Sequence, residues 1–108
     1  MAATPSTLRG TFARRLRAER LRLGISQREL GRRIGLSEDV VSNRVTRYES
    51  GASEPDFETV RKLAHALGVP VAYLLADTDL LGEIILAAAA LSPTEQKRLL
   101  ASLKSGKS

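Results

Sequence analysis

Residues 24–49 read GISQRELGRRIGLSEDVVSNRVTRYE, two short helical patterns separated by a turn that Gly35 marks. Ser26 and Glu29 have the spacing of a capping box, in which the serine hydroxyl and the glutamate carboxylate each accept a bond from an unpaired backbone N–H. This pattern predicts a helix over residues 27–34 that Gly35 closes. Its apolar residues share one face and its arginines lie outside that face: Leu30 and Ile34 inside, Arg28, Arg32 and Arg33 outside.

The second half of this stretch allows two interpretations. In one, Ser37 caps a single continuous helix. In the other, residues 37–41 form a loop and Ser42 caps a shorter helix that begins at Asn43. We favour the second, because it gives the helix one apolar and one polar face. The expected division places Val45 and Tyr48 inward and Asn43, Arg44, Thr46 and Arg47 largely outward.

Helical patterns also precede and follow this stretch. Thr11 can cap a helix that ends at Gly24, Asp56 precedes an apolar stripe that ends at Gly68, and Pro70 opens a last short helix. Two Phe, two Tyr and no Trp in 108 residues leave few of the aromatic clusters that mark strands, so an all-α protein is expected. The expected core residues are Phe12, Leu16 and Leu23 in the first of these helices and Phe57, Val60, Leu63, Ala64 and Leu67 in the second.

The net positive charge belongs to the first half of the chain. Residues 1–50 carry eleven Arg and five acids, whereas residues 51–108 carry six Lys or Arg and seven acids. This asymmetry is expected of a polyanion-binding face, although a solvated arginine-rich surface has the same composition. The chain has no Cys, no signal-peptide pattern and no apolar run near the roughly 20 residues that span a bilayer, so a cytoplasmic location is expected.

Residues 77–104 form a separate helical pattern. Residues 80–91 are apolar on almost every side, so this helix is expected to be buried all round. Residues 92–95, Ser-Pro-Thr-Glu, then start a second helix with a capping box. We expect the two to form an αα-hairpin that either covers the bundle or, as we favour, joins two copies of the chain, and we expect a flexible arm at 1–10 and a tail at 105–108. The expected dimer contacts are Leu81, Ile84, Ile85, Leu91, Leu99 and Leu103.

Five short motifs follow one another in a set order and spacing: Ser26-Gln27-Arg28-Glu29-Leu30, Gly35-Leu36-Ser37, Tyr48-Glu49-Ser50-Gly51, Pro55 and Leu67-Gly68-Val69-Pro70. Together they resemble the Cro/repressor-type (XRE-like) helix-turn-helix family over roughly residues 10–76. The resemblance implies a five-helix bundle over residues 11–76. Its second and third helices would form the helix-turn-helix, and the third would lie in the major groove of double-stranded DNA.

The resemblance also implies roles for individual residues. Asn43 and Arg47 would face base edges, with Ser42 and Thr46 nearby, because Arg bonds guanine and Asn bonds adenine bidentately; Asn43 beside a helix start has a capping role as its alternative. Gln27 would bond a phosphate and brace the third helix. The other expected backbone contacts are Arg14, Arg28, Arg33 and Arg44, and the expected structural ion pair across the first and third helices is Arg20 with Glu49.

The chain departs from the family pattern in two places. The segment after Ser37 is four residues longer than the usual spacing, and the extra residues either extend the third helix or form a loop. Carboxylates at Glu38 and Asp39 would be repelled by phosphates, which favours a loop directed away from DNA. The second departure is Ala52-Ser53-Glu54, where related domains often carry a basic residue.

These features predict a sequence-specific transcriptional regulator, most simply a homodimeric repressor that reads a pseudo-palindromic operator. The alternative is an antitoxin-type regulator that acts mainly through a protein partner, which would co-purify with it. Enzymatic activity is not expected, since His65 is the sole histidine, there is no Cys for a metal site and no cofactor motif is present. His65 is expected at the surface.

Overall fold

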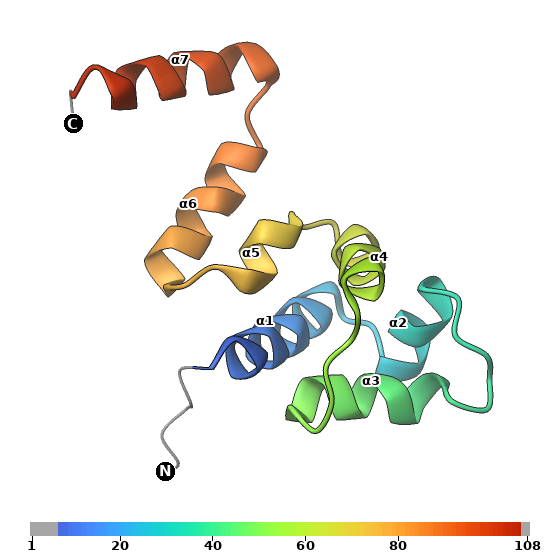
Figure 1. Cartoon of the computed structure of the whole chain (residues 1–108). Coiled ribbons are helices and arrows are strands. Elements are labelled where there is room, and N and C mark those ends of the chain that lie inside the picture. The colour runs from blue at the N-terminus through green and yellow to red at the C-terminus, as the bar shows by residue number, and fades with distance from the viewer. Residues whose placement is uncertain (1–6, 107–108) are drawn as a thin grey trace.

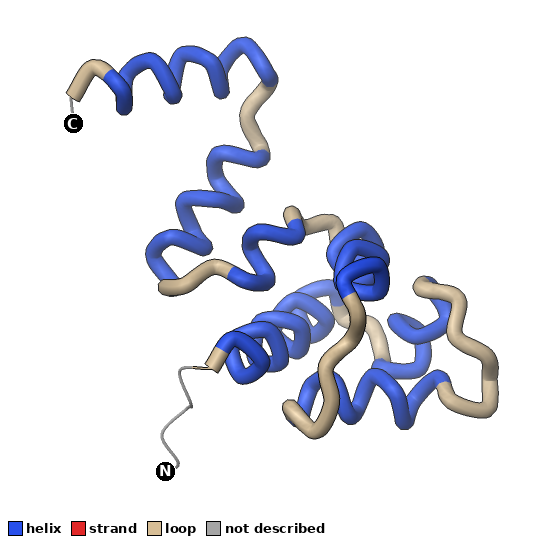
Figure 2. The backbone as a smooth tube through the Cα atoms, in the orientation of Figure 1, coloured by secondary structure: helices blue, strands red, loops and turns tan. Residues whose placement is uncertain are grey.

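The computed structural model describes residues 7–106, and within them all regular structure is helical (Figures 1 and 2). The all-α prediction is therefore confirmed. The helices are α1 (Leu8–Leu23), α2 (Gln27–Arg33), α3 (Val41–Ser50), α4 (Phe57–Leu67), α5 (Val71–Leu75), α6 (Asp79–Ala89) and α7 (Pro93–Lys104).

Helix α1 begins four residues earlier than predicted. Thr7, not Thr11, is its N-cap: the Thr7 hydroxyl accepts a bond from the Gly10 N–H at 3.0 Å, and residues 8–10 are already helical. The expected arm therefore does not reach residue 10, and residues 1–6 lie outside the described part of the chain. The helix ends as predicted at Gly24, whose φ of 73° lies in the left-handed region that glycine adopts without a Cβ penalty.

Helices α1 to α5 pack around one apolar core, as expected for a five-helix bundle. Asp56 caps α4 through the Thr59 N–H at 2.8 Å, and the stripe after it faces inward. Two predicted core residues are wrong: Phe57 is 90% exposed because it is the first residue of α4 and points out of the bundle, and Leu23 is 38% exposed in the last turn of α1. The buried core comprises Phe12, Leu16, Leu30, Ile34, Val45, Tyr48, Val60, Leu63, Ala64, Leu67, Val69, Tyr73 and Leu74.

Helices α2 and α3 come into close contact at Gly31. A Cβ built there would lie 2.8 Å from the Val41 carbonyl oxygen and would also collide with the Val41 side chain. Gly31 and Val41 are both buried. A glycine in the middle of a helix costs stability, so its presence here reflects this contact between the two helices.

Helix α6 is joined to the bundle by a buried arginine. The Arg15 guanidinium donates to the carbonyl oxygens of Tyr73 and Ala76 at 2.8 and 2.6 Å and pairs with Asp79 at 3.2 Å. It also lies 5.5 Å from the centre of the Tyr73 ring, a cation–π distance. The Tyr73 hydroxyl donates to Glu19 at 3.1 Å. One side chain of α1 thus holds the end of α5 and the start of α6.

The two C-terminal helices differ from the predicted hairpin. Helix α7 leads away from α6 instead of lying along it (Figure 1), and none of its residues is buried. In α6 only Gly82 is buried, so the expectation of burial all round is wrong for a single chain. The reason is geometric: α1 to α5 already enclose their own core, and α6 can present only one side to it. The predicted capping box of Ser92 and Glu95 is present.

The Gly31 contact predicts a sharp difference between two helical glycines. Gly31→Ala should lower the free energy of unfolding by about 1–3 kcal/mol, the usual cost of overpacking. Gly82→Ala is the matched control, because a Cβ there meets the Tyr73 ring at an ordinary 3.4 Å, so stability should stay unchanged or rise by about 0.5 kcal/mol from helix propensity. Urea unfolding of both variants measures this, and equal losses would contradict the role assigned to Gly31.

Candidate nucleic-acid interface

Helix α3 has one buried and one exposed face. Val45 and Tyr48 point into the core, whereas Asn43, Arg44 and Arg47 are exposed, as predicted. The helix begins at Val41, two residues before Asn43, and no side chain caps it. Ser42 therefore lies inside the first turn and is not the N-cap; its side chain lies outside the described part of the structure. The exposed polar residues of α3 therefore begin in its first turn, at Asn43.

The segment between α2 and α3 is a loop, in agreement with the favoured interpretation. Residues 36–40 are not helical, and the Val40 N–H bonds the Ser37 carbonyl in a turn. The Glu38 side chain folds back from this loop onto α2, where it pairs with Arg28 at 2.8 Å and Arg32 at 3.0 Å. The Arg32 hydrogen bond holds the pKa of the Glu38 carboxyl below its usual value. Glu38 therefore does not extend α3.

A buried ion pair fixes α3 against α1. Arg20 donates to the two oxygens of Glu49 at 2.6 and 3.0 Å, and its remaining nitrogen bonds the Ile25 carbonyl at 2.9 Å. The expected pair is thus present, with side chains 10% and 3% exposed. The hydrogen bond to Glu49 raises the pKa of Arg20. Because both charges lie away from water, removing either side chain would leave the other charge buried and unpaired.

Gln27 extends this pair to α2. Its amide nitrogen donates to Glu49 at 3.0 Å, and its amide oxygen accepts a bond from the Thr46 hydroxyl at 2.6 Å. The bracing role predicted for Gln27 is therefore observed. The capping box predicted for α2 is half right: the Ser26 hydroxyl accepts from the Glu29 N–H at 2.9 Å, but the Glu29 carboxylate pairs with Arg33 because that arginine lies one turn further along the helix.

The arginines predicted to contact phosphates lie in different places. Arg28 lies in the first turn of α2 and Arg44 in the first half of α3, and both are exposed. Arg14 lies on α1 beside Gly51, at the opposite end of α3, and pairs with Asp79 at 3.0 Å. Arg33 lines a hollow between α2 and α4 together with His65, which is exposed. The structure thus gathers Gln27, Arg28, Arg44, Asn43 and Arg47 around the two helices and separates Arg14 and Arg33 from them.

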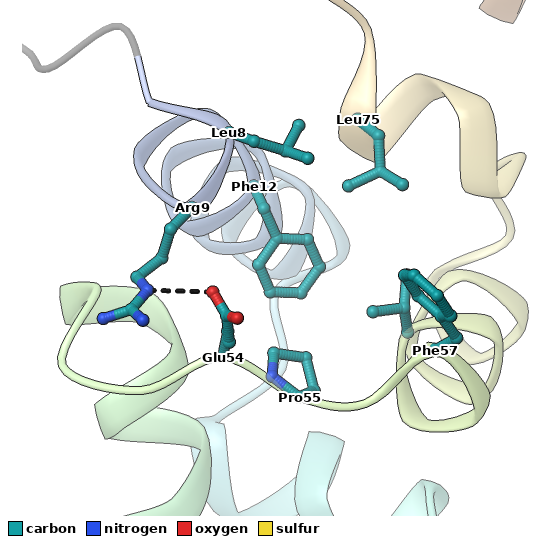
Figure 3. Close-up of a pocket in the computed structure, with 8 residues that line it drawn as sticks. Leu8, Arg9, Phe12, Glu54, Pro55, Phe57 and Leu75 are labelled. Atoms are coloured by element: carbon teal, nitrogen blue, oxygen red, sulfur yellow. Dashed lines mark hydrogen bonds and ion pairs between the residues drawn. The ribbon is translucent and has the colours of Figure 1, made fainter.

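Two further arginines were missed from sequence. Arg9 pairs with Glu54 at 3.1 Å and donates to the Gly51 carbonyl at 3.3 Å, which joins α1 to the loop after α3. This pair stands at the edge of an apolar hollow (Figure 3) with a volume of about 130 Å³. Arg32 was treated only as a solvent-exposed residue, although its spacing of four from Arg28 places both on one face of α2. A cap at Thr7, in place of Thr11, would have placed Arg9 in the first turn of α1 and not in an arm.

Residues 7–106 contain no group of three His, Cys, Asp or Glu side chains arranged to hold a metal ion. No helix in the same range combines the length and the apolar character that crossing a membrane requires.

A comparison with known families decides the classification, because a model described as helix-turn-helix matches residues 16–74. The chain belongs to the helix-turn-helix family. The match begins within α1 and ends within α5, and it includes Arg20, Gln27 and Glu49, which hold α3 in place. This classification confirms the resemblance seen in the sequence motifs.

Two relatives of this helix-turn-helix chain are informative. It is 35% identical over 68 residues to the cryptic phage CTXphi transcriptional repressor RstR of Vibrio cholerae, a match that covers 63% of the chain and 58% of that repressor. The matched region is thus less than two thirds of the repressor's length. The crystal structure of transcriptional regulator BswR is similar with a TM-score of 0.78 and 38% identity, covering 86% of this chain and 92% of the other.

The buried ion pair yields a prediction for this helix-turn-helix. Arg20→Met and Glu49→Leu, made singly, should each lower the free energy of unfolding by about 3–5 kcal/mol, because each leaves one buried charge unpaired. The double variant should lose less than either single variant, since an apolar contact replaces two desolvated charges. Thermal and urea unfolding measure the cycle, and simple additivity of the two losses would contradict the pairing.

Proposed function

We propose that this chain, a DNA-binding transcriptional regulator of the helix-turn-helix family, works as a homodimer that reads a pseudo-palindromic operator through the major groove and represses transcription by occupying it. The observation that carries the proposal is the exposed polar face of α3, presented by a helix that the Arg20–Glu49 pair holds in one orientation. We assign the protein no catalytic role, and we place it in the cytoplasm, together with the DNA that it binds.

Base reading is assigned chiefly to Asn43 and Arg47. Both are exposed on α3, and no carboxylate of the described residues forms an ion pair with Arg47 or with its neighbour Arg44. An unpaired guanidinium is available to bond guanine O6 and N7, and an asparagine amide can bond adenine N6 and N7. Ser42 and Thr46 are assigned nearby contacts, while Arg44, Gln27 and Arg28 are assigned phosphates.

The homodimer is supported by the exposed apolar side chains of the C-terminal helices. Leu81 and Ile84 on α6 and Leu103 on α7 are 43%, 51% and 62% exposed. A helix of twelve residues is only marginally stable by itself in water, so α7 needs a surface to cover its leucines. A second copy supplies the same apolar surface by symmetry.

The six residues predicted for this contact do not all face the same way. Leu91 and Leu99 are half-buried and stay in the proposed interface, whereas Ile85 packs partly against the core of the bundle. The similarity to BswR covers too much of the chain to end at α5 and must include residues of the C-terminal helices. In the proposed dimer the two α3 helices lie about 34 Å apart and read half-sites one DNA turn apart.

The assignment of base and phosphate contacts predicts different behaviour for two neighbouring arginines. Arg47→Ala should lower affinity for the operator about 5- to 100-fold and relax base preference at one position, because a bidentate contact to guanine is lost. Arg44→Ala should weaken binding to all duplexes alike and reduce the slope of log affinity against log salt by about one. Selection from random DNA followed by salt-dependent titration measures both. Unchanged base preference in Arg47→Ala would reject its assigned role.

The dimer proposal predicts a change in oligomeric state. Ile84→Glu places two carboxylates in the symmetric interface. The dissociation constant of the dimer should rise at least about 100-fold, because two buried isoleucines are lost. Phe57→Glu is the control, because Phe57 is equally apolar and more exposed but lies on α4, away from α6 and α7. Sedimentation should show monomers for the first variant and dimers for the second and the unaltered chain. A monomeric unaltered chain, with and without DNA, would remove the dimer.

A further inference from the structure

The Glu38 carboxylate binds two arginines of α2 from the loop that leads into α3. Its Oε1 atom lies 2.8 Å from Arg28 and its Oε2 atom 3.0 Å from Arg32, so one carboxylate bridges two guanidinium groups. We propose that Arg28 and Arg32 form a binding site for one phosphate group of DNA, and that Glu38 occupies this site in the free protein. The inference rests on the proposed function and adds Arg32 and Glu38 to the residues that act in it.

The chemistry of the site matches a phosphodiester. Two unesterified oxygens on one centre can bridge the arginines in the way that the two carboxylate oxygens of Glu38 do. Arginine binds both groups through the same N–H donors. Arg28 and Arg32 lie four residues apart on one helical face, so their spacing is set by the helix and persists when the carboxylate leaves.

The exposure of the three side chains makes this exchange possible. Arg28, Arg32 and Glu38 are 47%, 51% and 62% exposed, and ion pairs in water are held weakly. The buried Arg20–Glu49 pair has no such freedom. The hydrogen bond between Arg32 and Glu38 lowers the pKa of Glu38 and raises the pKa of Arg32. Both side chains therefore remain charged at neutral pH.

The site also lies where a phosphate would come. Gly31, between the two arginines in sequence, touches Val41 in the first turn of α3. The loop that carries Glu38 leads directly into the same end of α3 (Figure 1). When the second helix of such a motif lies in the major groove, the first helix, here α2 with Arg28 and Arg32, crosses the sugar–phosphate backbone.

The consequence concerns affinity. Any duplex whose phosphate enters the site must displace Glu38, so the carboxylate lowers the affinity for DNA of every sequence by the same cost. Glu38 thus limits the sequence-independent part of binding, which phosphate contacts supply.

The test compares two adjacent acids. Glu38→Gln frees both arginines, whereas Asp39→Asn removes the same charge from the next residue, which is exposed and forms no ion pair among the described residues. On a random-sequence duplex, Glu38→Gln should bind about 10-fold tighter, with a salt slope steeper by about one. Asp39→Asn should bind within about 2-fold of the unaltered chain. Adding Arg32→Gln to Glu38→Gln should return the affinity towards that of the unaltered chain.

Equal effects of Glu38→Gln and Asp39→Asn would overturn the inference. A second arm needs no DNA: inorganic phosphate is titrated into the full chain while the side-chain N–H signals of Arg28 and Arg32 are followed by NMR. These signals should shift at lower phosphate concentration in Glu38→Gln than in the unaltered chain, and an equal response would also overturn it. If no variant binds DNA, the proposed function fails while the phosphate arm still decides the site. Glu38→Ser repeats the charge change should Glu38→Gln disturb the loop.

Discussion

The ion pair between Arg20 and Glu49 is the contact on which the orientation of α3, the proposed recognition helix, depends. It joins the end of α1 to the end of α3, and through Gln27 it also reaches the start of α2. Because both charges are nearly removed from water, rotating α3 would strand a buried charge, which costs several kcal/mol. Val45 supports the same orientation from the apolar side. The exposed face of α3 is therefore set by interactions on its hidden face.

The arginines of this chain divide by burial into two kinds. Arg15 and Arg20 are buried and bind fixed partners, so they act as structural links between helices. Arg28 and Arg32 are half-exposed and bind a carboxylate that water screens, so their partner can change. Arginine thus links the helices inside the bundle and forms exchangeable ion pairs on its surface. A net charge taken from the sequence cannot separate these roles, because it counts every guanidinium alike.

Some interactions within one helix turn were predictable from the sequence, although the caps expected at Thr11 and Ser42 are wrong. Between distant segments, the resemblance to a family supplied the Arg20–Glu49 pair, but the other contacts had no local signal. The caps at Ser26, Asp56 and Ser92 need only residues three positions away, and all three are present. Arg15 instead meets backbone carbonyls about sixty residues further along the chain, and no local pattern marks such a contact. Phe57 fits an apolar stripe by its spacing, but the direction of a first-turn residue depends on where the helix lies in the bundle.

The way α6 is held determines what a dimer can transmit to the DNA. Arg15 binds the end of α5 and the start of α6, and the Tyr73 ring lies against Gly82, so α6 follows the bundle as one body. Helix α7 is linked to α6 by a short turn and by one hydrogen bond from Gln96 to the Ala88 carbonyl at 2.8 Å. In the proposed dimer, a symmetric contact through α6 would set the separation of the two α3 helices, whereas α7 would add apolar area without fixing that distance. The spacing of the half-sites would then depend on Arg15 of α1, which is distant from the residues to which we assign base contacts.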